Sequence, residues 1–230
     1  IKALEKEDLV KAVQLENRFV IPLAYMEWCG VKLDVEKWKA KMVKDAKRLK
    51  IALTKLNDWV VKHYGKDSRF TKVDLQGDLF SGFNTDPQCA INWNSAAQVI
   101  PLFKAIGINT STIDSKTKKL KDSVDANILK PQAKDFEILP IYLDYKEAQK
   151  VCSTYGQNWL DQINPETGRV YTKFNQLGTN TARISSGGKD KNAGIEYVNF
   201  LNLPADPETR SCFIAEKGNS WISIDYSGKK

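Results

Sequence analysis

Apolar side chains recur at helical spacing over much of residues 3–159. After Asp34, which stands in an N-cap position, they follow steps of three and four residues and predict an amphipathic helix of about thirty residues. Its apolar positions are Val35, Trp38, Met42, Ala46, Leu49, Leu53, Leu56 and Val60. The same spacing predicts a helix within residues 3–29, interrupted near Pro22 and ended by Gly30, before a short extended link over residues 31–33.

A second long helix is predicted after Pro131, running to about Trp159. Between the two long helices, the apolar pattern of residues 94–107 predicts one helix, and Ser123 caps a shorter one that reaches Leu129. Two long helices joined by such a compact tip predict an antiparallel helical arm.

Two stretches of this arm lack helical periodicity. Residues 64–91, punctuated by glycines and Pro87, predict an irregular insertion that is either a solvated loop or a binding site for an accessory protein. Residues 111–121 are rich in Ser, Thr and Lys. Their lysines Lys116, Lys118 and Lys119 suit contacts to phosphate groups, although a solvated loop explains them equally well.

The pattern changes to that of strands after residue 160. Asn164–Gly168 has the composition of a turn, and Arg169–Phe174 alternates between apolar and polar residues. The apolar run from Trp221 to Tyr226 predicts a final strand that is central in a sheet. We therefore expect the α+β class, with a mostly helical arm followed by a partial antiparallel sheet whose last strand has an unpaired side.

Charge and cysteine usage narrow the function. The net charge is +7 and the isoelectric point is about 9.1, which favours an anionic partner. Four scattered cysteines without a CxxC pair, together with one histidine, His63, argue against a zinc site and a Ser-His triad. Because no apolar run reaches the roughly twenty residues that span a bilayer, we expect no membrane contact and a cytoplasmic location.

The candidate chemistry lies in the last sixty or so residues. Arg183 is surrounded by hydroxyl side chains, among them Thr179 and Thr181, and by no acids, which suits a polyanion. Asp225 ends the final apolar strand, where a carboxylate suits a metal ion beside that polyanion. In the second long helix, Lys146 and Lys150 share a face, and they either clamp a phosphate backbone or pair with the neighbouring acids.

A series of motifs, in order along the chain, resembles the DNA polymerases of the bacterial polymerase I type (family A), which include phage members. The motifs are Ile21–Glu27, Gly30–Asp34, Asn92–Ser95, Lys150–Tyr155, Asn164–Val170, Phe174–Gln176, Thr179–Ser186, Asn199–Pro204, Thr209–Arg210 and Asp225–Ser227. Each is weak alone, and their joint order and spacing are specific.

The resemblance implies an architecture and a reaction. Residues 1–33 would lead into a thumb formed by residues 34–160, and residues 161–230 would form the N-terminal part of a palm. The chain would belong to a DNA-directed DNA polymerase with two Mg²⁺ ions, primer–template DNA and deoxynucleoside triphosphates as partners. A processivity factor is compatible with the family, although no residue here indicates one. The implied location is the cytoplasm of a bacterial or phage-infected cell.

The resemblance also implies roles for individual residues. Asp225 resembles the first palm carboxylate, a ligand of both metal ions, helped by the main-chain carbonyl of Tyr226. Arg183 resembles the arginine that enters the minor groove at the primer terminus, and Asn199 and Asn202 resemble the asparagines that follow it along the duplex. The remaining implied contacts are Arg210 near the triphosphate, and Lys146 and Lys150 on the template–primer backbone.

Departures from the family pattern limit what is expected of these residues. Leu201 stands where the family has a glutamine, Ala182 where it has a glycine, and Lys230 where it has the glutamate that excludes a 2′-hydroxyl. The second palm carboxylate and the fingers have no counterpart, so we expect the 230 residues alone to be inactive. The alternatives are a stand-alone, non-catalytic DNA-binding module and a helical interaction protein that is basic by accident.

Overall fold

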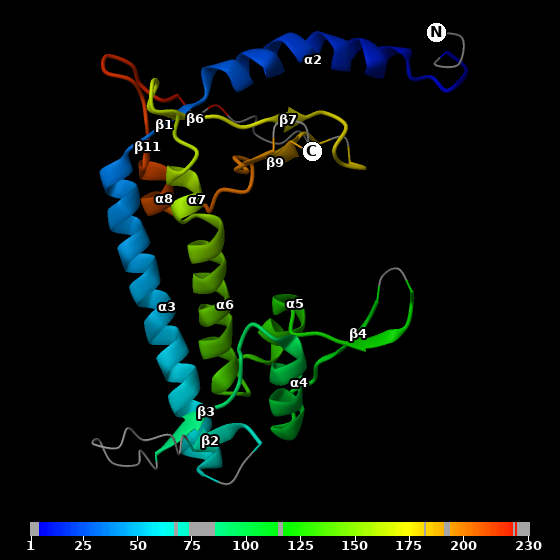
Figure 1. Cartoon of the computed structure of the whole chain (residues 1–230). Coiled ribbons are helices and arrows are strands. Elements are labelled where there is room, and N and C mark those ends of the chain that lie inside the picture. The colour runs from blue at the N-terminus through cyan, green and yellow to red at the C-terminus, as the bar shows by residue number, and fades with distance from the viewer. Residues whose placement is uncertain are drawn as a thin grey trace. The chain divides into compact units, whose positions relative to one another are not determined.

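The structure is a computed structural model that describes residues 5–66, 69–73, 86–114, 117–181, 183–190, 194–222 and 224. The chain divides into two compact units, and the ribbon of each can be followed in Figure 1. Unit 1 consists of Ile1–Val43 and Thr154–Lys230, and unit 2 consists of Lys44–Ser153.

Unit 1 is built around a small antiparallel sheet. Helix α2 (Val10–Cys29) leads into strand β1 (Val31–Leu33), which is the middle strand between β11 (Phe213–Ile214) and β6 (Arg169–Val170). Lys32 is the central residue of the register, opposite Ile214 on one side and Arg169 on the other. The extended link predicted over residues 31–33 is therefore strand β1, and both strands that pair with it come from the C-terminal segment of unit 1.

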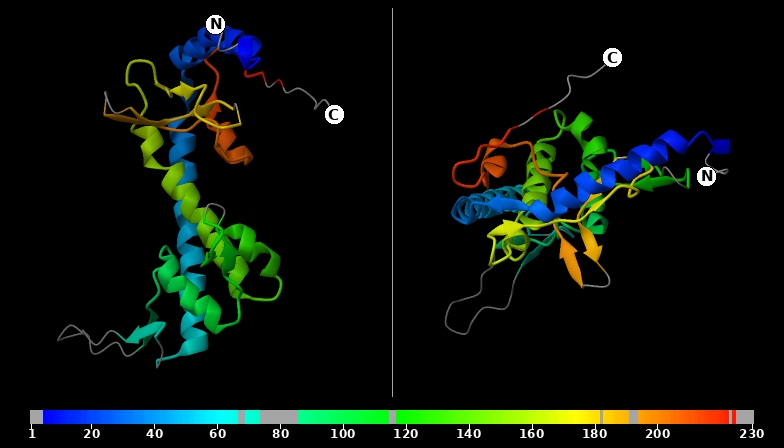
Figure 2. Two further views of the ribbon diagram at one scale, coloured as in Figure 1. Left: turned by 90° about the vertical axis from the view of Figure 1, so that its right-hand side faces the viewer. Right: turned by 90° about the horizontal axis from the view of Figure 1, so that it is seen from above.

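Short strands and helices complete unit 1. Strand β7 (Phe174–Asn175) pairs with β8 (Ser185–Ser186), and β9 (Gly188–Asp190) pairs with β10 (Ile195–Tyr197) in the hairpin drawn orange in Figure 2. The remaining helices of the unit are α7 (Gln157–Leu160) and α8 (Pro207–Ser211).

An aromatic cluster forms the centre of unit 1. The rings of Trp38 and Trp159 lie 5.3 Å apart, and Phe213 meets both edge-on. Phe200 stacks on Trp159 at 5.4 Å. The indole N–H of Trp38 donates to the carbonyl of Gly156 at 3.1 Å, so the buried ring leaves no polar atom unsatisfied. This cluster fixes the loop that carries Phe200 to the ends of two helices.

Unit 2 is helical. Helix α3 (Val35–Tyr64), which begins in unit 1, runs beside α6 (Ile138–Thr154), and α4 (Ala96–Ala105) and α5 (Ala126–Leu129) pack in the same unit (Figures 1 and 2). Contacts from Arg48 to Asp144 and from Trp59 to Glu137 show that α3 and α6 are antiparallel. Strands β2 (Thr71–Val73), β3 (Pro87–Cys89), β4 (Ser111–Ile113) and β5 (Leu120–Asp122) and the 3₁₀ turn η1 (Lys130–Gln132) complete it.

The core of unit 2 follows the predicted periodicity of α3. Leu56 and Val60 are fully buried on its inner face, together with Val99, Leu102, Phe103, Leu129, Ile138, Leu139 and Tyr142 from the other helices. Each large apolar side chain buried in this way contributes about 1.5–3 kcal/mol. The predicted amphipathic helix, the antiparallel arm and the α+β class are confirmed.

The structure corrects several predicted boundaries. The second long helix begins at Ile138 and ends at Thr154, because Gly156 breaks it before the separate helix α7. The short helix before it is preceded by Asp125 rather than by Ser123, whose hydroxyl accepts from the N–H of Asp125. The ends of these helices are therefore set by residues with non-helical backbone angles, such as Gly156, although the apolar spacing continues past them.

Other corrections concern strands. The insertion of residues 64–91 contains the β2–β3 hairpin, and the basic stretch of residues 111–121 contains the β4–β5 hairpin. The predicted continuous strand Arg169–Phe174 is divided into β6 and β7.

The predicted final strand is not formed in the part of it that the structure describes. Trp221, Ile222 and Ile224 have no ladder partner and are 60%, 78% and 85% exposed. A strand needs a neighbour for its backbone hydrogen bonds, and apolar sequence cannot supply one.

No helix within the described ranges combines the length and apolarity that crossing a bilayer requires.

Candidate nucleic-acid interface

The loop that carries Arg183 is fixed through its main chain. The hydroxyl of Thr179 donates to the carbonyl of Arg183 at 2.7 Å and accepts from its N–H at 3.0 Å. It also lies 3.3 Å from the hydroxyl of Thr181. Arg183 itself is exposed to solvent. Thr179 was predicted as a DNA contact, and the structure places its hydroxyl where it holds the backbone of the arginine.

Asn199 and Asn202 lie in a loop whose backbone is held at several points. The hydroxyl of Thr172 donates to the carbonyl of Val198 at 2.6 Å, and the N–H of Val198 donates to Gln162 at 2.9 Å. The hydroxyl of Tyr155 donates to the carbonyl of Asn202. Because these three partners come from three separate segments of the chain, the loop has one defined conformation while the Asn202 side chain remains exposed.

Arg210 is placed by helix α8, which begins at Pro207. The carboxylate of Asp206 caps the helix by accepting from the N–H of Thr209 at 2.7 Å. Partial burial raises the pKa of Asp206, but the Thr209 N–H and the nearby Lys41 outweigh it, so the net pKa is lowered. The Arg210 guanidinium donates to the carbonyl of Pro204 at 3.3 Å and lines a hollow of about 480 Å³.

A buried lysine lies near both ends of helix α8, close to Asp206 and Cys212. Lys41 is 3% exposed and its ammonium lies 5.4 Å from the ring centre of Trp38. Burial raises the pKa of the neighbouring Cys212 thiol, so the thiol stays neutral. The hydroxyl of Thr209 is buried without a hydrogen-bond partner in the part of the chain that the structure describes.

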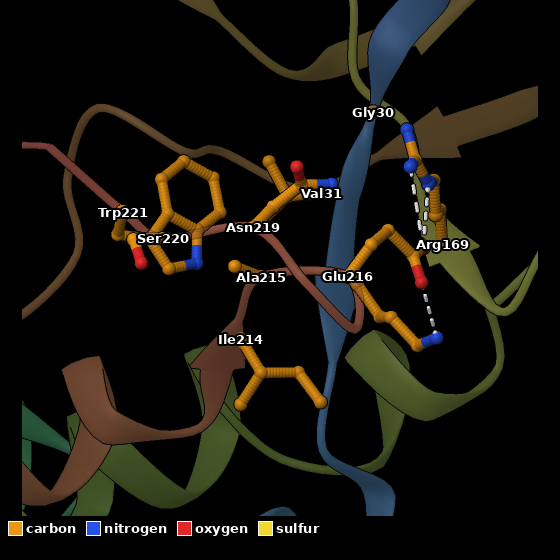
Figure 3. A pocket seen from close by; sticks show the side chains of 10 residues that line it. Gly30, Val31, Arg169, Ile214, Ala215, Glu216, Asn219, Ser220 and Trp221 are labelled. Carbon is orange, nitrogen blue, oxygen red and sulfur yellow. Dashed lines mark hydrogen bonds and ion pairs between the residues drawn. The ribbon is translucent and has the colours of Figure 1, made fainter.

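An ion network joins strands β1 and β6 of the unit 1 sheet to the segment that follows β11, as Figure 3 shows. The carboxylate of Glu216 accepts from Lys32 at 2.7 Å and from the guanidinium of Arg169 at 3.2 Å. Arg169 also donates to the carbonyl of Cys29 at 2.6 Å. Hydrogen bonds from Lys32 and Arg169 lower the pKa of Glu216. The network borders a hollow of about 200 Å³ that Trp221 also lines.

Gly30 lets strand β1 approach this network. Its φ is +57°, and a Cβ there would lie 2.7 Å from the Tyr171 ring and 2.9 Å from the carbonyl of Val170. Only a residue without a side chain fits both the left-handed backbone and the close approach.

Lys146 and Lys150 lie together on α6, four residues apart. The structure does not show them paired with Asp144 and Glu147, because both acids bind Arg48, at 2.6 and 3.0 Å. Within the described residues neither lysine has an ion pair, and both line a hollow of about 910 Å³ that Asp125 and the two Arg48-bound acids also line. Two ammonium groups are thus left available to an anion on one helix face.

The basic tip carries the next predicted contacts. Lys118 and Lys119 are exposed in the turn between β4 and β5, and Lys118 has a left-handed φ of 57°. Lys121 of the same hairpin is bound to Asp114 at 2.8 Å. Lys116 lies outside the described residues. The hairpin therefore presents Lys118 and Lys119 at its turn, while a salt bridge closes its base.

The candidate metal ligands Asp225 and Tyr226 lie outside the described residues. Within the ranges that are described, no three His, Cys, Asp or Glu side chains gather in a way that could hold a metal ion. The donor set that the sequence offers is one carboxylate and one main-chain carbonyl. These are oxygen ligands of the kind that Mg²⁺ prefers, but too few to enclose two ions.

Reasoning from sequence missed two residues that organise these surfaces. Arg48 lies outside the apolar pattern that predicts the first long helix, and its partners lie 96 and 99 residues away. Ser186 stands in the sequence only as the last residue of the motif Thr179–Ser186, and in the structure it is 6% exposed and bonds to Asn199. Neither has a local sequence signal, because in each case the partner is distant along the chain.

Comparisons with known proteins agree with these observations. Residues 83–229 match the sequence profile of a family described as DNA polymerase family A. The chain is similar to "DNA polymerase I, thermostable" of Thermus aquaticus, 30% identical over 215 residues, covering 93% of this chain and 22% of that protein. It is also similar to "DNA polymerase I" of Caldicellulosiruptor bescii, 36% identical over 116 residues, covering 49% of this chain and 13% of that protein.

A solved structure shares the fold. It is the POL domain of Pol1 from M. smegmatis in complex with DNA primer-template and dNTP, with a TM-score of 0.54 and 21% identity. The likeness covers 83% of this chain and 27% of that one. The chain thus spans less than a quarter of the length of the two curated relatives, at 22% and 13%.

Proposed function

The chain belongs to DNA polymerase family A, and from this premise we propose that it is the duplex-binding part of a DNA-directed DNA polymerase. The parent enzyme extends a primer along a template by nucleotidyl transfer from deoxynucleoside triphosphates. Residues 34–160 act as the thumb, residues 161–230 as the first part of the palm, and residues 1–33 lead into the thumb. The cytoplasm of a bacterial or phage-infected cell is the compartment that this function implies.

One observation carries the proposal. Among the residues that the structure describes, neither Lys146 nor Lys150 has an ion pair, since Arg48 binds the carboxylates of Asp144 and Glu147. Arg183 is exposed in its loop. Cationic side chains without a carboxylate partner suit the phosphates and groove edges of a duplex.

The donors divide between the two parts of a duplex. Lys146 and Lys150 bind the phosphate backbone, as do Lys116, Lys118 and Lys119 at the tip, and these contacts hold the duplex without reading sequence. Arg183, Asn199 and Asn202 donate to the minor groove, where every base pair offers acceptors at similar positions. Thr179 and Thr181 support the Arg183 loop at the same surface, and Arg210 faces the triphosphate.

The metal chemistry is proposed for Asp225 and the main-chain carbonyl of Tyr226. When bound, two Mg²⁺ ions supply activation of the primer 3′-hydroxyl and stabilisation of the leaving pyrophosphate. Because this donor set is too small for two ions, further carboxylates must come from outside these 230 residues. We therefore expect the 230 residues assayed alone to bind primer–template and not to extend it.

Primer extension by the full-length polymerase tests the function. The wild-type enzyme should extend a labelled primer with Mg²⁺, and Asp225→Asn should abolish extension while leaving duplex affinity within about twofold, since the carboxylate faces ions rather than phosphates. Duplex affinity measured by fluorescence anisotropy should fall steeply with salt. Binding without extension would favour the non-catalytic module, and salt-insensitive binding would favour an interaction protein.

A further inference from the structure

Ser186 has a hydroxyl group whose hydrogen-bonding capacity is completely used. Its oxygen accepts from the N–H of Phe200 at 2.9 Å and from the N–H of Leu201 at 3.2 Å. A hydroxyl accepts at most two hydrogen bonds and donates one, so its proton is left for the side-chain oxygen of Asn199, 3.0 Å away. The serine is 6% exposed, so water cannot replace these partners.

The carboxamide of Asn199 has a defined orientation for the same reason. Its oxygen Oδ1 accepts from the N–H groups of Leu201 at 2.9 Å and Asn202 at 3.1 Å, in addition to Ser186. Main-chain N–H groups only donate, so the atom they approach must be the oxygen. The other end, the Nδ2 amide, has two N–H donors and no bonded partner in the described part of the chain. Asn199 thus offers donors and no acceptor.

The approach of Ser186 to this loop depends on the residue after it. Gly187 has a φ of +80°, and a Cβ there would lie 2.9 Å from the carbonyl of Tyr197 and 3.0 Å from the main chain of Val198. Its N–H donates to the carbonyl of Lys173 at 2.9 Å. The glycine lets β8 lie directly against the loop, within reach of the Asn199 side chain.

The course of the loop does not depend on Ser186 alone. Thr172 and Gln162 hold the main chain of Val198, and Tyr155 holds the carbonyl of Asn202. Ser186 also holds the main chain of the loop at Phe200 and Leu201, and it alone among these residues connects the carboxamide of Asn199 to the strand that follows Arg183. Comparison with a variant that loses another bond to the loop, such as that of Thr172, therefore separates the effect of Ser186 on the side chain from its effect on loop stability.

We propose that Ser186 is a positioning residue for duplex recognition, whose buried hydroxyl holds the Asn199 carboxamide with its oxygen inward and its amide donors toward a minor-groove acceptor. The proposal rests on the proposed function, and it adds that in one contact Asn199 is the hydrogen-bond donor and the DNA is the acceptor. The ligand atom is an N3 of a purine or an O2 of a pyrimidine, the acceptors that the minor groove presents in every base pair. The contact therefore checks base-pair position without selecting sequence.

Deletion of single acceptors tests the polarity. The full-length polymerase is given primer–templates in which one purine near the primer terminus carries a C–H in place of N3, moved through successive base pairs. At the position read by Asn199, the wild-type enzyme should lose about three- to tenfold in kcat/KM, the worth of one hydrogen bond. Asn199→Asp keeps an oxygen for the three N–H and O–H donors that face it, so it should fold. Because it has no amide, its kcat/KM should be the same with and without the N3 atom at that position.

Ser186→Ala tests the positioning role. The variant should extend normal DNA more slowly. Loss of the purine N3 at the position read by Asn199 should then lower its kcat/KM only slightly, while the same loss at the position read by Arg183 should lower it as in the wild type. Thr172→Val is the matched control, because it removes a buried hydroxyl bond to the same loop without touching the carboxamide. It should lower the melting temperature and keep the wild-type sensitivity at both positions.

Several results would overturn the inference. One is a Ser186→Ala enzyme with undiminished sensitivity, and another is a Thr172→Val enzyme that loses sensitivity to the same extent. A third is sensitivity confined to neutral methylphosphonate linkages, which would assign the amide to phosphate oxygens. If the wild-type enzyme extends no primer at all, the proposed function fails instead, so the two failures are distinguishable.

Discussion

The guanidinium of Arg48 lies 2.6 Å from the carboxylate of Asp144, across 96 residues of sequence. The same guanidinium binds Glu147 at 3.0 Å. Since these two acids neighbour Lys146 and Lys150 on α6, one arginine on α3 decides the electrostatic character of the α6 surface. It removes the acids that would otherwise compete with an anionic partner for the two lysines.

Removing either lysine should therefore weaken duplex binding. Lys146→Ala and Lys150→Ala are each expected to reduce the slope of log affinity against log salt by about 1, because each loses one phosphate contact. The loss should be the same for unrelated DNA sequences. Lys55→Ala, an exposed lysine of α3, serves as control and should keep the wild-type slope. An unchanged slope in both α6 variants would contradict the thumb contact.

Removing Arg48 should weaken binding although the residue is not proposed to touch DNA. In Arg48→Met, Asp144 and Glu147 become available to Lys146 and Lys150, so duplex affinity should fall. The stability cost should stay below about 1 kcal/mol, because the paired side chains are 45% and 43% exposed and solvent screens them. Anisotropy titration and urea unfolding give the two quantities.

A second ion pair of unit 2 provides the comparison. Lys104→Met breaks the pair with Asp122, which has a length of 2.6 Å and is similarly exposed. It should cost comparable stability and leave duplex affinity unchanged. Equal losses of affinity in the two variants would show that general charge, rather than the acids beside Lys146 and Lys150, determines binding.

Gly30 should tolerate no side chain. Gly30→Ala forces an L-residue into φ +57° and places its Cβ 2.7 Å from the Tyr171 ring. Gly65 has a similar φ of +60° with nothing within 4 Å, so Gly65→Ala measures the backbone strain alone. We expect a loss of about 1 kcal/mol for Gly65→Ala and more than about 3 kcal/mol for Gly30→Ala, measured by urea unfolding. Equal losses would mean that Tyr171 moves aside freely.

Glu216 should make unit 1 sensitive to acid. Its pKa is lowered in the folded chain by Lys32 and Arg169, so the unfolded chain binds a proton at higher pH than the folded one. The stabilisation is complete above the ordinary glutamate pKa of about 4.3 and disappears as pH falls below it, toward the lowered pKa.

Melting temperatures of the wild type and Glu216→Gln should show this dependence. The wild type should melt higher at neutral pH, and the two curves should converge in acid. Lys32→Met, which removes the partner of Oε2, should shift the profile in the same direction by a smaller amount. Parallel curves for wild type and Glu216→Gln would exclude a role for the ion network.

The limits of sequence reasoning are visible in particular elements. The pattern of Leu56 and Val60 predicted α3 correctly, since one helix face repeats every three to four residues regardless of the rest of the chain. The same reasoning extended α6 past its end at Thr154 and predicted a strand at Trp221. Apolar spacing states what an element would bury, and it does not state where the backbone turns or whether a neighbouring strand exists.

By itself, the sequence determined the helical arm, the α+β class and the family motifs, and it proposed Arg183, Asn199, Lys146 and Lys150 as candidate donors. These depend on local periodicity and on the chemistry of single side chains. Only the tertiary structure decided which donors are available and which way they face. Arg48 takes up acids 96 and 99 residues away, and Ser186 sets a carboxamide 13 residues away. Hydrogen bonds and ion pairs act over a few ångströms, so their partners are chosen by the fold and not by the order of the chain.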